Sequence, residues 1–329
     1  MGTSDATPKA RPFDDKAILL LLSVGAIIAY VYSSQLDRST LSLRMTLHDQ
    51  IIDNTALSPY RYRILIPLIA EAFARVLSAA CSREIAFRLA YAICDLTAVA
   101  VLLIALFVWL REWFSTDRSL IGVLFVAGTM PIALQDHYFQ PWSLPETALL
   151  AAALLAVRRR RYGVLAGLVA VASLNRETAV FIPLAFLVTG VDFRKLVDRR
   201  KSEVTPMLLS VGLFALWLAI FWGLRYFRGS AAPVATISGL LHANTTPGNL
   251  ARAVLNGSLF LGVFWAFAVL GYRSAPRFVQ RLAWIIPPYV VTVGLWGVWY
   301  EVRLLMPLYP VLIPMGLSFV YREEATDEV

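Results

Sequence analysis

Charged side chains are scarce in this sequence. They make up 16% of the 329 residues, whereas apolar residues make up 58% and the mean hydropathy is +0.65. Ordinary soluble chains carry about 25% charged residues, so this composition excludes a soluble globular protein. Apolar runs long enough to cross about 30 Å of hydrocarbon recur along the chain, without the alternation of transmembrane strands. We therefore expect an all-α, polytopic membrane helix bundle.

Two other absences restrict the classes of function that this sequence can have. The chain has two cysteines, Cys81 and Cys94, and their spacing is not that of a metal or redox site. The net charge of +8 is not concentrated on a polar domain, as it would be in a nucleic-acid binder. No nucleotide-binding motif is present. We expect no nucleic-acid partner, and we interpret the basic excess as a signal of membrane topology.

The apolar runs predict about ten transmembrane helices within one integral-membrane domain, residues 1–329. The candidate spans are 17–34, 87–110, 119–134, 143–157, 163–174, 179–191, 205–224, 257–271, 282–299 and 304–320. Two of them, 163–174 and 179–191, are too short to cross alone. We interpret these two as a pair that meets at a recessed turn, Leu174 to Thr178, because one continuous helix would place the basic run 194–201 outside.

The distribution of positive charge predicts the orientation. With the N-terminus inside, all four lysines and the larger share of the 30 lysine and arginine residues are cytoplasmic. The tails 1–16 and 321–329 are then cytoplasmic, and 35–86 and 225–256 are outer loops of an inner-membrane protein. Residues 61–80 are apolar enough to span, but we expect an amphipathic helix on the outer surface, because another span would reverse everything after it.

In this topology most recessed polar residues lie on the outer, periplasmic side, in short turns between apolar helices. Charged groups in such turns must face the bundle or a cavity, so they are candidates for function. They are Asp37, His48, Asp49, Asp53, Arg61, Arg63, Asp136, His137, Arg176, Glu177, His242, Glu301 and Arg303. The cytoplasmic charges form runs such as 158–161, which are typical of solvated topology signals.

Several of these acids also have a purely structural interpretation. Glu146 fits a capping box that begins at Ser143. Glu177 follows Asn175 in a first helical turn, where a carboxylate complements the helix dipole. Asp95 lies within a span, where it can pair with Arg88 or belong to a site. Asp49 and Asp136 have no capping or pairing role in the sequence, which favours function for both.

Helix direction adds an argument for anion binding. Every even-numbered span would point its N-terminus, with four free N–H groups, at the outer face. Arg61, Arg63, Arg176 and Arg303 lie on the same side. Together these groups suit a phosphate at membrane level, and a phosphate at that depth is most naturally a lipid headgroup.

Three segments resemble the GT-C class of integral-membrane glycosyltransferases, with mannosyltransferases and aminoarabinose transferases as the nearest likenesses. The segments are Ser58-Pro59-Tyr60-Arg61-Tyr62-Arg63, Asn175-Arg176-Glu177-Thr178, and the run from Glu301-Val302-Arg303 to Pro307-Leu308-Tyr309-Pro310. Acidic residues in the first two outer segments, Asp49 and Asp136, also resemble that class. Many members have more spans and a C-terminal soluble domain, and this chain has no Asp-x-Asp pair, so metal dependence stays open.

The resemblance implies transfer of a hexose or pentose, with inversion, from a polyprenyl-phosphate donor to a cell-envelope glycan, lipid or protein acceptor on the periplasmic side. The residues that it implies are Asp49 as general base, Asp136, Glu177 and Glu301 as further catalytic carboxylates, Arg61, Arg63, Arg176 and Arg303 on the donor phosphate, and His48, His137 and Asp95 as substrate-binding groups. The alternative is a transporter or flippase for a lipid-linked or anionic solute, which Asp95 and the broken 163–191 pair favour. A non-catalytic assembly partner would not need so many recessed charges.

Overall fold

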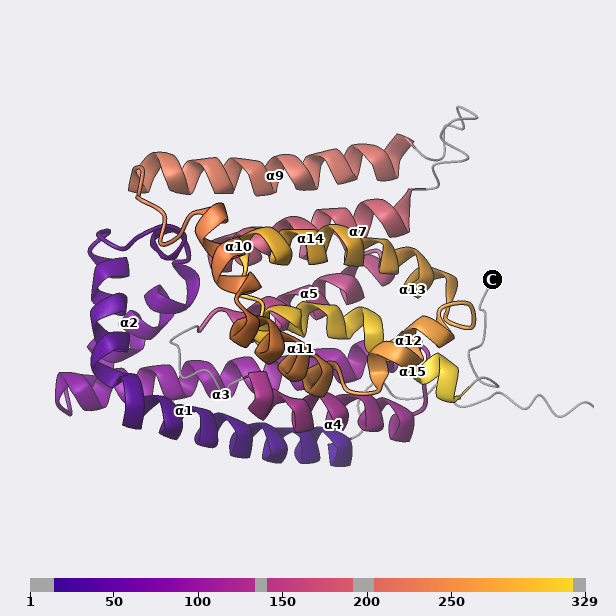
Figure 1. The fold of residues 1–329 in the computed structure, drawn as a ribbon, viewed down its shortest axis with the longest axis horizontal. Coiled ribbons are helices and arrows are strands. Elements are labelled where there is room, and N and C mark those ends of the chain that lie inside the picture. Colours follow the sequence, from indigo (N-terminus) through magenta and orange to yellow (C-terminus); the bar gives the residue numbers. More distant parts are fainter. Residues whose placement is uncertain (1–14, 134–140, 192–203, 322–329) are drawn as a thin grey trace, which may run out of the picture.

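The computed structural model describes residues 15–133, 141–191 and 204–321 as a bundle of helices whose axes run mostly along one direction (Figure 1). Within these residues the β-pairing is limited to one isolated bridge, between Ser58 and Pro233. The all-α prediction is confirmed. Because each helix pairs its backbone N–H and C=O groups internally, the apolar side chains on its outside can pack against neighbouring helices or face lipid.

The helices in chain order define the frame for the site. They are α1 (Asp15–Ile52), η1 (Tyr60–Tyr62), α2 (Leu65–Leu77), α3 (Arg83–Leu110), α4 (Thr116–Ala133), α5 (Ser143–Arg158), α6 (Tyr162–Asn175), η2 (Glu177–Val180), α7 (Phe181–Gly190), α9 (Val204–Arg228), α10 (Ile237–Thr245), α11 (Pro247–Leu261), α12 (Phe264–Gly271), α13 (Arg277–Leu282), η4 (Ala283–Ile285), α14 (Ile286–Trp296), η5 (Val302–Leu308) and α15 (Tyr309–Val320). Much of the predicted outer loops 35–86 and 225–256 is therefore helical.

Among the described helices, five are long and apolar enough to cross a membrane. They are Asp15–Ser34, Arg83–Leu110, Val204–Arg228, Arg277–Trp296 and Val302–Val320. The bent pair α11 and α12, which meet at 66°, would make a sixth if the two form one span. The other four predicted runs are also helical over their described residues, as α4, α5, α6 and α7.

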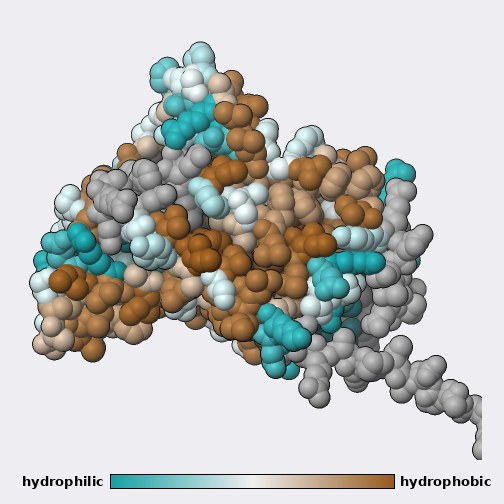
Figure 2. Space-filling view, turned by 90° about the horizontal axis from the view of Figure 1, so that it is seen from below, coloured by the Kyte–Doolittle hydropathy of each residue, from teal (hydrophilic) through white to brown (hydrophobic). Residues whose placement is uncertain are grey.

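The apolar surface of the bundle belongs in lipid. The 28 residues of α3 reach about 42 Å, more than the roughly 30 Å of a hydrocarbon core. Helix α9 packs on α6 and α7, yet only 11% of its most apolar window is buried. Figure 2 shows apolar side chains over most of the middle of one face, with hydrophilic groups toward both ends. These helices indicate a multi-pass membrane protein.

The predicted break between 163–174 and 179–191 is confirmed. Helix α6 ends at Asn175, and Arg176 adopts an extended backbone (φ −162°, ψ 150°) before η2 and α7. The ring of Tyr162, at the start of α6, lies 5.7 Å from that of Phe186 in α7. The chain therefore doubles back at the polar turn, which keeps Arg176 and Glu177 at one end of both helices.

The segment 61–80 contains a short helix, α2. Its 13 residues reach about 20 Å, too little to cross a membrane. Ile66, Pro67 and Ala70 are buried, while Leu68 and Val76 on the other side are exposed. The prediction of a separate amphipathic helix is confirmed, and its buried face packs on α3.

The bundle has two ends that differ in their connections. Helix α2, η1, the last turns of α1 and the end of α9 lie together at one end, here called the α2 end (Figure 1). Helix α13 and the turns 111–115, 158–161 and 272–276 make the opposite end, here called the α13 end. Helix α1 begins and α15 ends nearer the α13 end (Figure 1).

Candidate functional site

Arg63 is the central cation of the α2 end. Its Nε and Nη2 atoms donate to Oε2 of Glu177, at 3.1 and 3.0 Å, across 114 residues of sequence. The guanidinium lies over the rings of Tyr60 and Trp142, 5.8 and 5.7 Å from their centroids. Trp142 Nε1 donates to the Arg63 carbonyl at 2.9 Å, so the backbone and side chain are both held. Arg63 is thereby fixed between the loop before α2 and the α6–α7 turn.

A second buried ion pair lies beside the first. Arg176 Nη1 donates to Oε2 of Glu146 at 2.5 Å, and Thr178 Oγ1 donates to the other carboxylate oxygen. The expected capping box is wrong, because the side chain of Glu146 reaches Arg176 and Thr178 and gives α5 no side-chain cap. The pair joins the start of α5 to the turn after α6. Asn175 Nδ2 adds a hydrogen bond to the Trp142 carbonyl at 3.0 Å.

The two pairs act on each other electrostatically. Burial lowers the pKa of Arg63, Glu177 opposes this effect, and Arg176 lowers the pKa further, so that the net shift is downward. Two arginines and two glutamates thus share one water-poor region, here called the Arg63 cluster (Arg63, Glu146, Arg176 and Glu177). Two guanidinium groups this close to each other suit an anion whose oxygens can bind both of them. Buried cations of this kind are stable only beside negative charge.

Residues of the Arg63 cluster and their chain neighbours have buried polar atoms without a hydrogen-bond partner among the described residues. They are Ser143 Oγ, Asn175 Oδ1, Arg176 Nε and Glu177 Oε1. Buried polar atoms in folded proteins are nearly always paired, so a group of free ones needs an explanation. Arg176 Nε and Ser143 Oγ can donate to the oxygens of an anion, and Asn175 Oδ1 and Glu177 Oε1 can accept from ligand hydroxyls, so these atoms together suit a ligand that carries both an anionic group and hydroxyl groups.

A narrow pocket opens beside the Arg176–Glu146 pair. Its polar lining consists of Glu146, Asn175, Arg176, Thr178 and Tyr289, and apolar side chains of α5, α6, η2, α7 and η5 complete it. The free space holds about one water molecule. A sugar phosphate therefore needs movement of the surrounding side chains before it fits.

Arg303 belongs to a different neighbourhood. Its Nη2 donates to Oε2 of Glu301 at 2.5 Å, and its Nε lacks a hydrogen-bond partner among the described residues. The hydroxyl of Tyr32 is within electrostatic range of Arg303, Arg44 and Asp95. Asp95 also accepts a hydrogen bond from Ser33 at 3.2 Å. This second group of buried charges joins α1, α3 and the start of η5.

Arg61 stabilises the fold through hydrogen bonds to backbone carbonyls. Its guanidinium donates to the backbone carbonyls of Ala56, Arg228 and Ser230. These bonds tie the loop before η1 to the end of α9. Of the four arginines predicted to hold phosphate, Arg63 and Arg176 lie together, Arg303 lies in the second group, and Arg61 is used by carbonyl groups.

Asp49 lies on the last turns of α1, where its carboxylate pairs with Arg83 at 2.5 Å. The Asp49 side chain is 38% exposed and that of Arg83 is 70% exposed. Such surface pairs contribute about 0–1 kcal/mol, so a substrate can displace Arg83 at little cost. Asp136 and His137 lie outside the described residues.

His48 is buried one turn from Arg44 and joins three helices. Its Nδ1 contacts the Tyr91 hydroxyl at 2.9 Å and its Nε2 contacts Glu71 at 3.0 Å. Burial raises the pKa of Glu71, but hydrogen bonds from Arg75 and His48 outweigh it, and the net shift is downward. His48, predicted to bind substrate, here connects α1 to α2 and α3.

Sequence reasoning missed some of these partners. Arg88 pairs with Glu84 at 2.7 Å, so the expected Arg88–Asp95 pair does not form. Arg44 is 2% exposed and packs over the rings of Phe87 and Tyr91. The sequence signal for Arg44 is that it lies four residues before His48. This spacing places both side chains on one face of a helix that continues beyond the apolar run.

Within residues 15–133, 141–191 and 204–321, no three His, Cys, Asp or Glu side chains are close enough to hold a metal ion. Comparison of the chain with protein-family models, with curated proteins and with solved structures gives no match.

Proposed function

We propose that this protein is a membrane glycosyltransferase of GT-C type, which moves a sugar from a polyprenyl-phosphate donor to an acceptor at the α2 end of the bundle. The observation that carries the proposal is the Arg63 cluster, with its unpaired buried atoms, at one end of an apolar helix bundle. A lipid-linked phosphate brings an anionic group to that depth while its chain stays among the apolar helices. We further propose about ten spans, cytoplasmic termini and an inner-membrane location with the α2 end facing the periplasm.

Arg63 and Arg176 are the proposed ligands of the donor phosphate. A guanidinium fork matches two phosphate oxygens at once, and two forks can neutralise the charge that grows as the phosphate leaves. Glu177 and Glu146 hold the forks in place before the donor arrives and keep the buried cations compensated. Arg303, with its free Nε, is a proposed further contact that would require the second charge group to approach the first.

Asp49 is the proposed general base. The acceptor hydroxyl oxygen attacks C1 of the sugar while the bond from C1 to the phosphate oxygen breaks, and the phosphate leaves with the bonding electrons. The hydroxyl proton passes to the Asp49 carboxylate, and attack from the opposite face inverts C1. An exposed carboxylate held by one flexible arginine is accessible to an acceptor. A positioned base of this kind contributes about 10²–10⁴-fold in rate.

The test uses the purified protein in lipid nanodiscs with polyprenyl-phosphate hexose and pentose donors. We expect release of polyprenyl phosphate with formation of a new glycoside. Arg63→Lys should weaken donor binding about tenfold or more, because an ammonium cannot copy the fork. The matched control is Arg88→Lys, which changes an arginine that also forms an ion pair but lies on α3, away from the Arg63 cluster. This variant should bind donor normally.

Two results would overturn the proposal. Equal donor affinity in the wild type, Arg63→Lys and Arg63→Ala would remove Arg63 from the phosphate site. Movement of an intact donor between leaflets without cleavage of its C1–O bond would instead identify a flippase.

A further inference from the structure

The two ends of the bundle differ in how their arginines are compensated. At the α2 end, four arginines have carboxylate partners within the described residues, in the pairs Arg63–Glu177, Arg75–Glu71, Arg83–Asp49 and Arg88–Glu84, whereas Arg61 and Arg228 donate to backbone carbonyls. Among the described residues of the α13 end, arginines outnumber carboxylates: Arg111, Arg118, Arg158, Arg159, Arg160, Arg161, Arg273, Arg277 and Arg281 stand against Glu112 and Asp117. The described part of the α13 end therefore carries a strong positive charge.

The turns and the helix that carry these basic residues, here called the basic patch, are joined to one another by side-chain contacts. Arg159 donates to Glu112 at 2.7 Å, which joins the α5–α6 turn to the α3–α4 turn. The ring of Trp113 lies 6.3 Å from that of Phe278, which joins the α3–α4 turn to α13. Arg281 donates to the Val188 carbonyl at 2.9 Å, which joins α13 to α7.

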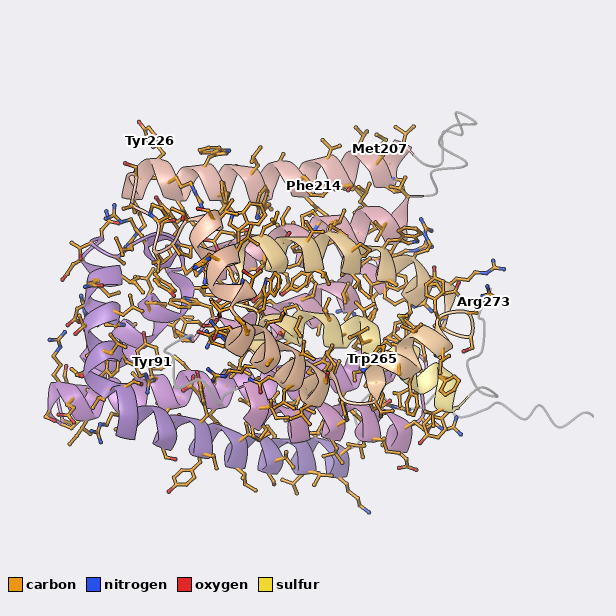
Figure 3. All side chains as sticks on the ribbon, viewed as in Figure 1. Tyr91, Met207, Phe214, Tyr226, Trp265 and Arg273 are labelled. Carbon is orange, nitrogen blue, oxygen red and sulfur yellow. The ribbon has the colours of Figure 1, made fainter. Side chains whose placement is uncertain are left out.

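Four arginines of the basic patch are available to bind an external anion. Arg160, Arg161, Arg273 and Arg277 are exposed, and their side chains have no ion-pair or hydrogen-bond partner among the described residues. Arg273 reaches outward from the end of the bundle (Figure 3). Unlike the paired arginines of the α2 end, these four can each accept an external anion without breaking an existing contact.

The surroundings of the four arginines indicate the kind of anion. Exposed Tyr162 follows Arg161, and exposed Tyr272 precedes Arg273. Tyrosine beside arginine is typical of the headgroup level of a membrane. Exposed apolar side chains, Val164 on α6 and Leu270 on α12, lie further along the same helices. Charge at the end and apolar surface behind it match a headgroup and its acyl chains.

We propose that Arg160, Arg161, Arg273 and Arg277 bind the headgroups of anionic phospholipids at the α13 end. The phosphodiester supplies the missing negative charge, and the tyrosines and apolar helix surfaces contact the glycerol and the chains. Each basic residue near an anionic surface adds about fivefold to binding. Loss of two should therefore weaken binding about 25-fold.

The test is a lipid titration of the full chain in a neutral detergent. Phosphatidylglycerol or phosphatidylcholine is added, and the midpoint of thermal unfolding is followed by tryptophan fluorescence. We expect phosphatidylglycerol to raise the midpoint more than phosphatidylcholine. The double variant Arg160→Gln/Arg161→Gln should need about 25-fold more phosphatidylglycerol for half of the effect, and Arg273→Gln/Arg277→Gln should behave alike. Glutamine keeps the backbone strain at Arg160, whose φ is +54°, unchanged between the proteins compared.

The matched control is Arg75→Gln/Arg88→Gln, which removes the same charge from the α2 end and should leave the phosphatidylglycerol response as in the wild type. Equal effects of the two lipids on the wild type would overturn the proposal. So would an unchanged phosphatidylglycerol response in both double variants of the α13 end. A loss of stability in Glu323→Gln/Glu324→Gln without a lipid preference would assign these arginines to the chain's own acidic C-terminal residues.

Discussion

Removing the negative charge of Glu146 should destabilise the bundle strongly. Glu146→Gln keeps the size of the side chain but leaves the Arg176 guanidinium buried without a counter-charge. The two side chains are 8% and 10% exposed and their N–O distance is 2.5 Å, so bulk water does not reach the pair, and the single water that the adjoining pocket can hold carries no counter-charge. Breaking such a pair costs about 3–5 kcal/mol. At about 2 °C per kcal/mol for a chain of this size, the unfolding midpoint should fall by about 6 °C or more.

A double-mutant cycle identifies the cause. Arg176→Gln alone leaves the Glu146 charge unpaired, whereas Glu146→Gln/Arg176→Gln leaves two neutral amides. If the charges compensate each other, the double variant should recover at least about 1.5 kcal/mol relative to the sum of the single variants. Thermal unfolding in one detergent, followed by tryptophan fluorescence, measures all four proteins.

The alternative in which Glu146 is only a helix cap makes a different prediction. A cap contributes about 1 kcal/mol and is independent of Arg176. A midpoint shift below about 2 °C in Glu146→Gln, together with additive effects in the double variant, would refute the buried-pair account.

Three further predictions test other parts of the structure. Single cysteines at Gly248 and Gly163, both exposed, should react differently in intact cells with an impermeant thiol reagent, with Gly248 labelled and Gly163 protected; the reverse would invert the topology. Because the pKa of Glu71 lies below its ordinary value of 4.5, its stabilising contribution is present above about pH 4.5 and lost as pH falls through the lower folded pKa, so Glu71→Gln should flatten the acid arm of a pH–stability curve. Gly271→Ala should destabilise by about 1–3 kcal/mol, because its Cβ would lie 2.1 Å from the Met315 carbonyl oxygen, whereas Gly212→Ala in open space should not.

The helices were predictable because their signals are local. Apolar runs marked the helices, and the polar turn 174–178 inside an apolar stretch marked the break between α6 and α7. The amphipathic pattern of 65–77 was visible for the same reason. Local patterns of length and hydropathy are sufficient wherever the surrounding solvent is uniformly apolar.

The pairing of charges was not predictable in the same way. Arg63 and Glu177 are 114 residues apart, and nothing local indicates their contact. The Ser143 to Glu146 spacing matched a capping box, but a buried cation thirty residues later outweighs a cap. Arg61, in a motif that resembled a phosphate site, satisfies backbone carbonyls instead. In each case tertiary contacts decide which partner a charged side chain takes.

The rate of sugar transfer by Asp49→Asn tests the proposed function most directly. Asparagine keeps the size of the side chain and its hydrogen bond with Arg83 but cannot accept the acceptor's proton. The variant should fold, bind the polyprenyl-phosphate sugar as the wild type does, and transfer at least about 10²-fold more slowly. Full transfer by Asp49→Asn, with donor binding intact, would contradict the assignment of the base and remove the main chemical step of the account.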